Sequence, residues 1–341
     1  MYGSGIHKWL TIGGSYPGAL SAWFKSLYTS ADAAWSSSGV INVIQNYSMY
    51  DFDLYQASER SGQACVDVIR NVTNYIEDSI TNKLTPDDKY YVYQVFGGRD
   101  LPVADFMNYI ADSVAGAVQY GGREKMCNVF NSVATAPVKQ QLPVFDQFAI
   151  ISDGDIGQYN RDILRNTTYD INNNARQWSW QVCTEFGWFQ IPNAQEPMRS
   201  DLLGPDFWLQ WCKDIFSNNT GPPAVAWYNQ YYGSTNITGE KIIFANAIED
   251  PWQYAGMRQL NPQTQSGMRN VLINCNNCAH CVDLRTPNDA DAPTLTNARN
   301  YIKKSVIEWL TPSAADYEKA FGNSTKEMEA EVVLPSLFLQ E

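Results

Sequence analysis

Residues 8–28 of the chain read KWLTIGGSYPGALSAWFKSLY. The first part of this stretch, residues 8–13, is a short apolar run that ends in glycine, which predicts a buried strand. After the turn, residues 19–28 place Ala, Leu, Trp and Phe at helical spacing. Pro17 suits the first turn of this helix, where a missing backbone N–H is tolerated. The pattern therefore predicts that Ser15 lies at a tight strand–turn–helix junction.

Strand character recurs in AAWSSSGVINVI (33–44), KIIFANA (241–247) and NVLIN (270–274), and a helix is expected over 294–310. Between these regions the chain has helical period and no convincing alternation, which favours a mostly helical insertion. We expect an α/β class in which a mostly helical insertion separates two sheet-forming parts. The expected division is 1–44 and 222–312 for the two sheet-forming parts, 45–221 for the helical insertion, and 313–341 for an acidic tail.

Composition narrows the classes of function. The chain has 341 residues, 44% of them hydrophobic, and a net charge of −12. Because phosphate binding needs clustered Lys and Arg, this charge disfavours a nucleic-acid partner. No apolar run reaches the length of about 18 residues that a spanning helix needs.

Other features favour a lysosomal (vacuolar) or secreted protein. Seven cysteines suit an oxidising compartment. N-glycosylation sequons occur at Asn46, Asn71, Asn166, Asn218, Asn236 and Asn323. The N-terminus has no signal-peptide pattern, so we expect that an N-terminal part of the protein is missing from this chain.

Ser15 is a candidate nucleophile. A serine on a sharp strand-to-helix turn exposes its Oγ above the sheet, and the next backbone N–H, here that of Tyr16, faces the oxyanion. Gly13 and Ser15 fit the G-x-S-x-G pattern, whereas Pro17 holds the last position and Gly18 follows it. An ordinary turn between strand and helix is the alternative.

A serine nucleophile needs a base, and the chain has only His7 and His280. His7 precedes the strand that leads to Ser15, so it would lie about 25 Å away. His280 directly follows a predicted strand, where α/β active sites assemble. Asp250, which follows another strand, is the expected orienting acid, with Glu249 and Asp283 as rivals. A turn-forming role is the alternative for Asp250, because it precedes a proline.

The stretch INCNNCAHCVDLR (273–285) also raises the question of zinc. Four ligands within seven residues would strain tetrahedral geometry, and no second Cys/His cluster exists, so no metal is expected. Cys278 and Cys281 can brace the histidine loop by a disulfide or by packing. The partner of Cys275 can lie in a segment before Met1.

Four ordered motifs, GGSYPGALSAWF, RQWSWQVCTEFGWFQ, NQYYGSTNITGEKIIFANAIEDPWQ and CAHCVDLR, resemble the serine carboxypeptidase family of lysosomal Pro-X carboxypeptidase, dipeptidyl peptidase II and thymus-specific serine protease, with the thymus-specific branch most similar. The resemblance implies the same triad of Ser15, Asp250 and His280. It also implies an α/β-hydrolase fold whose N-terminal strands are missing, with 1–44 and 222–312 as its two parts and 45–221 as a helical cap that interrupts them. It implies disulfides Cys65–Cys127 and Cys183–Cys212. It also suggests substrate-binding roles for Trp252 and Glu185, with a core tryptophan and a structural ion pair as the respective alternatives.

The family cleaves after proline near a chain end, so the expected partner is such a peptide, with no cofactor. The sequence does not decide between N- and C-terminal trimming, and a homodimer is compatible with it. An esterase on the same fold and a non-catalytic binding glycoprotein are the alternatives. Family members have a long segment before the elbow that supplies a second oxyanion donor. We therefore expect the 341-residue chain alone to be insoluble or inactive.

Overall fold

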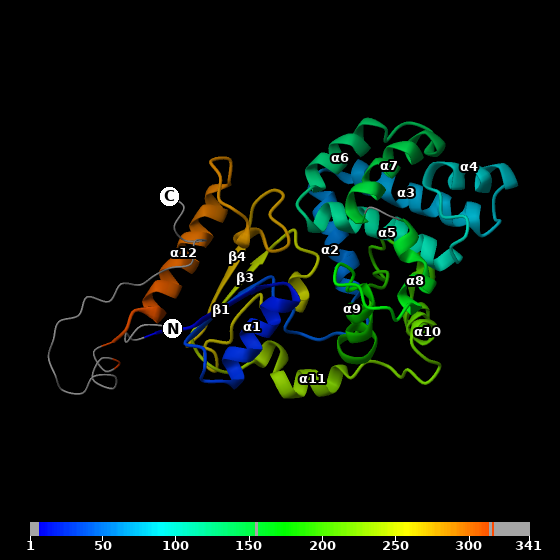
Figure 1. The fold of residues 1–341 in the computed structure, drawn as a ribbon. Helices are drawn as coiled ribbons and strands as arrows, with labels where there is room; N and C mark the ends of the chain where they lie inside the picture. Colours follow the sequence, from blue (N-terminus) through cyan, green and yellow to red (C-terminus); the bar gives the residue numbers. More distant parts are fainter. Residues whose placement is uncertain (1–6, 154–155, 314–315, 317–341) are drawn as a thin grey trace. The chain divides into compact units, whose positions relative to one another are not determined.

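The computed structural model describes residues 7–153, 156–313 and 316 (Figure 1). The chain forms two compact units. Of the described residues, the sheet unit contains those up to 42, residues 232–248 and those from 255 onward, and the helical unit contains those from 43 to 231 and residues 249–254. This division differs from the expected domain limits in three places. Residues 43–44, the segment 222–231 and the short loop 249–254 group with the helices rather than with the sheet.

Four parallel strands form the sheet of the first unit, in the order β1-β2-β3-β4. They are β1 (Leu10–Gly14), β2 (Ala33–Ser37), β3 (Ile242–Ala247) and β4 (Arg269–Ile273). The helices α1 (Tyr16–Leu27) and α12 (Pro293–Leu310) pack on this sheet. Because all strands run in one direction, their carboxyl ends lie at one edge, where the loops that follow them can meet.

The core of the sheet unit explains why these segments form strands. Every residue of β2 and β3 is buried, which fits their small and apolar composition. Side chains of β2 and β3 pack against one face of α12. This cluster contains Ala33, Trp35, Ile243, Ala245, Ile302, Val306, Trp309 and Leu310. The last four of these residues, whose helical spacing is visible in the sequence, therefore form the face that α12 buries.

The helical unit contains most of the helices. They are α2 (Ser48–Glu59), α3 (Gln63–Ile80), α4 (Pro86–Phe96), α5 (Val103–Gln119), α6 (Arg123–Ser132), α7 (Val138–Asp153), α8 (Arg161–Arg165), α9 (Ala175–Gln181), α10 (Pro205–Ile215) and α11 (Val225–Tyr232). A π-helical turn, η2 (Val182–Phe186), continues from α9. Short 3-10 turns occur at η1 (Ile156–Tyr159), η3 (Asp201–Leu203), η4 (Ser234–Asn236), η5 (Gln253–Ala255) and η6 (Val282–Leu284), of which η4 and η6 lie in the sheet unit.

The first part of the helical insertion has helical period over residues 53–80, and there the chain forms two helices, α2 and α3. Gly62 separates them with φ 102°, a conformation that side chains rarely adopt and that glycine tolerates. The helical period continues on both sides of this break, so the pattern alone did not reveal it.

Three disulfides cross-link the described residues. Cys65–Cys127 joins α3 to α6, and Cys183–Cys212 joins η2 to α10, which are the pairings that the family resemblance implied. The third, Cys275–Cys278, corrects the interpretation that Cys275 has its partner before Met1. A turn in which Cys278 N–H donates to the Cys275 carbonyl (3.3 Å) brings their Cα atoms to 5.2 Å, within disulfide range.

The expected acidic tail, 313–341, lies outside the described residues apart from Ser313 and Asp316, and so does the sequon at Asn323. Within the described part of the chain, none of the helices combines the length and apolar character required to cross a bilayer.

Candidate active site

Ser15 occupies the junction between β1 and α1 in a strained backbone conformation. Its φ is 61° and its ψ is −130°, which is rare for a residue with a side chain. Its N–H donates to the Ser37 carbonyl at 2.9 Å, which ties the turn to the end of β2. Strain that the surroundings enforce is typical of functional positions.

The turn around Ser15 leaves no room for side chains at two flanking glycines. A Cβ on Gly13 would lie 2.0 Å from the Pro17 carbonyl oxygen, and one on Gly18 would lie 2.7 Å from the Ser37 oxygen. All of these neighbours are backbone atoms, which cannot rotate away. Gly13 and Gly18 therefore permit a turn that is tight enough to present a half-buried Ser15 at its tip.

The loop after β4 carries His280 to the same edge of the sheet unit. His280 is 7% exposed, and Cys281 after it adopts a left-handed conformation with φ 53°. Cys281 N–H donates to Ser38 Oγ at 2.9 Å. A Cβ on Gly14 would lie 2.9 Å from Cys281 Sγ. The residue after His280 thus lies against the residue before Ser15.

Asp283 lies in the same loop but has a bracing role. Its two carboxylate oxygens accept hydrogen bonds from Trp35 Nε1 at 2.8 Å and Ser37 Oγ at 2.6 Å. Burial raises the pKa of this carboxyl, and the two donors oppose that shift. Because both oxygens are held by β2, Asp283 fastens the histidine loop to the sheet.

Asp250 is fully buried and belongs to the helical unit, in the loop Glu249–Tyr254. Its Oδ1 accepts the N–H of Trp252 at 2.9 Å, the local turn that an aspartate before proline favours. Trp252 lies in an aromatic cluster with Tyr47, Tyr50 and Trp188 and donates from Nε1 to Gln119 Oε1 at 2.9 Å. The tryptophan is partly buried, so it combines core contacts with some exposed surface.

Glu249, the rival acid, has its carboxylate held by arginines. Arg123 donates to both oxygens, at 3.1 Å from Nε and 2.8 Å from Nη2, and Arg60 Nε lies 2.9 Å from Oε1. The side chain of Glu249 is fully buried and that of Arg123 is 3% exposed. This cluster could not be predicted from the sequence pattern, because Arg123 and Glu249 are 126 positions apart.

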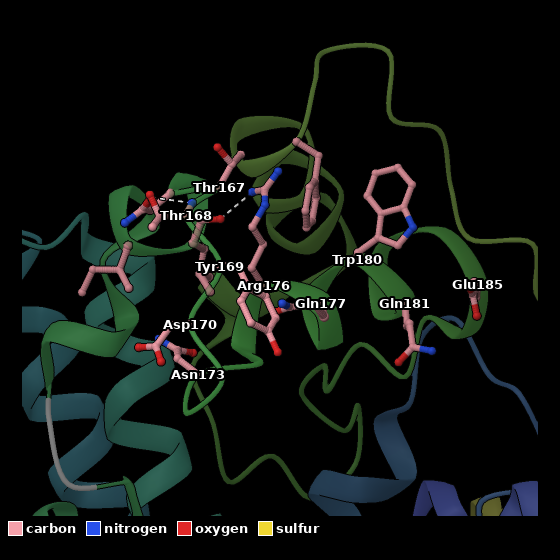
Figure 2. Close-up of a pocket in the computed structure, with 14 residues that line it drawn as sticks. Thr167, Thr168, Tyr169, Asp170, Asn173, Arg176, Gln177, Trp180, Gln181 and Glu185 are labelled. Carbon is pink, nitrogen blue, oxygen red and sulfur yellow. Dashed lines mark hydrogen bonds between the residues drawn. The ribbon is translucent and has the colours of Figure 1, made fainter.

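Glu185 lines a pocket of about 750 Å³ in the helical unit. Figure 2 shows Tyr169, from the loop after α8, together with Arg176 and Trp180 of α9 and Glu185 of η2. Arg176 packs its guanidinium 4.7 Å from the ring centre of Phe216 and donates to the Leu164 carbonyl. The pocket therefore combines aromatic surface with charged groups of both signs. The family resemblance suggested a binding role for Glu185, whereas the sequence pattern gave no sign of the pocket itself.

Tyr16, the expected oxyanion donor, is the first residue of α1, directly after Ser15. The sequon asparagines Asn46, Asn71, Asn166, Asn218 and Asn236 are all exposed. Cys281 is a free thiol, whereas Cys275 and Cys278 are bonded to each other and so cannot act as zinc thiolates. Over residues 7–153, 156–313 and 316, no cluster of three or more His, Cys, Asp or Glu side chains could hold a metal ion.

Comparison with known proteins adds independent evidence. The chain is 31% identical to "Probable serine protease EDA2" of Arabidopsis thaliana, over 83% of this chain and 56% of that one. It is 24% identical to mouse thymus-specific serine protease over 90% of this chain and 65% of the relative. Mouse lysosomal Pro-X carboxypeptidase is 25% identical over 88% of this chain and 64% of its own length.

The chain thus spans about three fifths of the length of such relatives. Residues 3–302 match the family model for serine carboxypeptidase S28, whose fold is of the α/β-hydrolase type. The parallel sheet, the elbow at Ser15 and the two helical-unit disulfides are in keeping with that match. The chain belongs to the serine carboxypeptidase S28 family.

Proposed function

We propose that this chain carries the triad of a serine peptidase, with Ser15 as nucleophile, His280 as base and Asp250 as orienting acid. The observation that carries the proposal is the backbone of Ser15, strained at φ 61° between two glycines that admit no Cβ. Such a turn presents a hydroxyl at a helix N-terminus, where the following N–H groups stabilise a developing negative charge.

The chemistry follows from these roles. His280 accepts the Ser15 proton while Oγ bonds to the substrate carbonyl carbon, and the Tyr16 N–H donates to the resulting oxyanion. The C–N bond then breaks as His280 returns the proton to the leaving amine, which leaves an acyl-enzyme. Water attacks the ester with His280 again as base, and the acid product and the free serine are released.

Asp250 is the best-supported orienting acid among the three candidates. Both carboxylate oxygens of Glu249 accept hydrogen bonds from guanidinium groups. Both carboxylate oxygens of Asp283 accept hydrogen bonds from Trp35 and Ser37. Asp250 accepts a backbone N–H on Oδ1, and it follows the third strand of the sheet, in the chain order Ser, Asp, His of α/β-hydrolases.

We infer that the substrate is a peptide cut after proline near one end. Support comes from a relative whose name is lysosomal Pro-X carboxypeptidase, and from Trp252 two residues after Asp250. The exposed part of this ring, backed by Tyr47 and Trp188, offers a flat apolar surface on which a proline ring can stack.

The test uses the protein with any residues that its gene encodes before Met1. A fluorophosphonate probe should label Ser15, and Ser15→Ala should abolish labelling and lower turnover of a prolyl peptide by about 10⁴- to 10⁶-fold. Peptides with proline second from the N-terminus and second from the C-terminus, beside short esters, report specificity. A folded protein without a Ser15 adduct would refute the proposal.

Glu185 is proposed as a substrate-binding residue of the pocket in the helical unit. Glu185 lines the pocket together with exposed aromatic residues, and an acidic residue in such a lining suits the amino group of a peptide. Glu185→Gln should raise KM about 10-fold, since one charge-assisted hydrogen bond contributes about 1.5 kcal/mol or more. The matched control is Glu196→Gln, which removes a carboxylate that pairs with Arg70 outside this pocket. Equal KM values for the two variants would contradict the role.

We further propose a lysosomal or secreted location with glycans on the exposed sequons. The disulfides and the relatives named as lysosomal or extracellular enzymes support this. Enzymatic removal of N-glycans from the native protein should lower its apparent mass. No change in mass would contradict the proposal.

A further inference from the structure

The loop Glu249–Tyr254 is fastened to the helical unit at several points. The Pro251 carbonyl accepts from Tyr47 Oη at 3.0 Å, Trp252 donates to Gln119 of α5, and Gln253 Nε2 donates to Asp53 of α2 at 3.2 Å. These bonds hold the part of the loop that follows Asp250. A separate group holds the part that precedes it.

That group is Glu249 with Arg123 and Arg60. Arg123, at the start of α6, forms a two-pronged ion pair with the carboxylate and also donates to Ser61 Oγ at 2.7 Å. Arg60, directly after α2, approaches the same carboxylate from a second helix. The two parallel hydrogen bonds between a planar guanidinium and a carboxylate fix both distance and orientation, which a single hydrogen bond does not.

Burial makes this anchor stiff. As whole residues, Glu249 and Arg123 are only 1% and 2% exposed. If the pair separates, each charge is left buried without its partner and without water, which is costly. A buried ion pair is weak evidence for net stability, because desolvation offsets much of the attraction. Its geometry, in contrast, strongly restricts where the main chain at residue 249 can lie.

We propose that Glu249 is a positioning residue for the reaction: gripped by Arg123 and Arg60, it fixes the main chain on the N-terminal side of Asp250 and so aims the Asp250 carboxylate. Adjacent Cα atoms are about 3.8 Å apart, so movement of residue 249 is passed directly to residue 250. This inference rests on the proposed triad, in which Asp250 must be held to within a fraction of an ångström.

The test measures the rate of fluorophosphonate labelling of Ser15 as a function of pH, which does not depend on the choice of peptide. Labelling of the wild-type protein checks the triad first. Glu249→Gln should then slow labelling about 10- to 100-fold, as expected when a catalytic group is misplaced by about 1 Å. The acid limb of the curve of labelling rate against pH should also move to lower pH in this variant, because a displaced Asp250 no longer favours the imidazolium form of His280.

Arg60→Gln is the milder second variant, because its side chain is 34% exposed and its loss leaves the Arg123 pair in place. It should shift the same acid limb in the same direction by a smaller amount. This keeps the inference testable if Glu249→Gln fails to fold.

Asp105→Asn is the matched control. Asp105 is a buried carboxylate of α5 that pairs in the same two-pronged way with Arg161, away from the Asp250 loop. It should lower the melting temperature while leaving the acid limb unmoved. If Glu249→Gln and Arg60→Gln behave like this control, the inference is overturned although the triad stands. If the folded wild-type protein does not label at all, the triad and this inference fall together.

Discussion

Replacing Gly13 by alanine tests the elbow with one methyl group. The new Cβ would lie 2.0 Å from the Pro17 oxygen, 2.3 Å from the Pro17 carbonyl carbon and 2.8 Å from the Gly18 nitrogen. Ordinary contact begins at about 3.4 Å, so the Pro17 carbonyl must retreat by more than about 1 Å. That carbonyl belongs to the first turn of α1, so the turn that carries Ser15 has to open.

The magnitude follows from this overlap. Overpacking of a rigid core costs about 1–3 kcal/mol and sometimes more, and the overlap with backbone atoms places this case near about 3 kcal/mol. For a unit of this size, such a loss lowers the melting temperature by about 6–12 °C. A displacement of Ser15 by about 1 Å should also slow its reaction with a fluorophosphonate about 100-fold.

The matched control is Gly221→Ala, because a Cβ there meets nothing within 4 Å. Melting temperature and Ser15 labelling rate are measured for both variants and for the wild type. If Gly13→Ala melts and labels like Gly221→Ala, the turn around Ser15 is not a tight one, and this outcome would count against Ser15 as the nucleophile.

Three further outcomes are expected. Removing the Cys65–Cys127 bridge, whose ends are 62 positions apart, should destabilise the protein by about 4 kcal/mol, as chemical denaturation would show. Removing Cys183–Cys212, with a separation of 29, should cost somewhat less, about 3.5 kcal/mol, and the reverse order would contradict the loop-length argument. Burial raises the pKa of the Asp283 carboxyl in the folded protein. The stability that this group contributes is therefore complete below its unfolded pKa and is lost as the pH rises through its folded pKa. Asp283→Asn should thus gain stability relative to the wild type as the pH rises from about 4 to about 7. An opposite slope in denaturation at these two pH values would refute the assignment of burial as the dominant cause.

Much of the fold could be predicted because its signals are local. The apolar run before Ser15, the helix with Pro17 in its first turn and the spacing of Ile302, Val306 and Trp309 each depend on neighbours along the chain. The turn at Gly62 was missed because a helical period continues through it. The Cys275–Cys278 bridge was missed because pairing depends on the turn that brings the two Cα atoms together.

The order of the candidate Ser, Asp and His, each after a predicted strand, can be read from the amino-acid sequence, and this order is enough to suggest a hydrolase. What surrounds each candidate emerges only when the chain is folded. It showed that Glu249 is held by two arginines distant in sequence, that Asp283 is fastened to β2, and that no Cβ fits beside Ser15. The reason is physical: residue types and periodicity are local properties, whereas the partner of a buried charge is set by the packing of helices far apart in the chain.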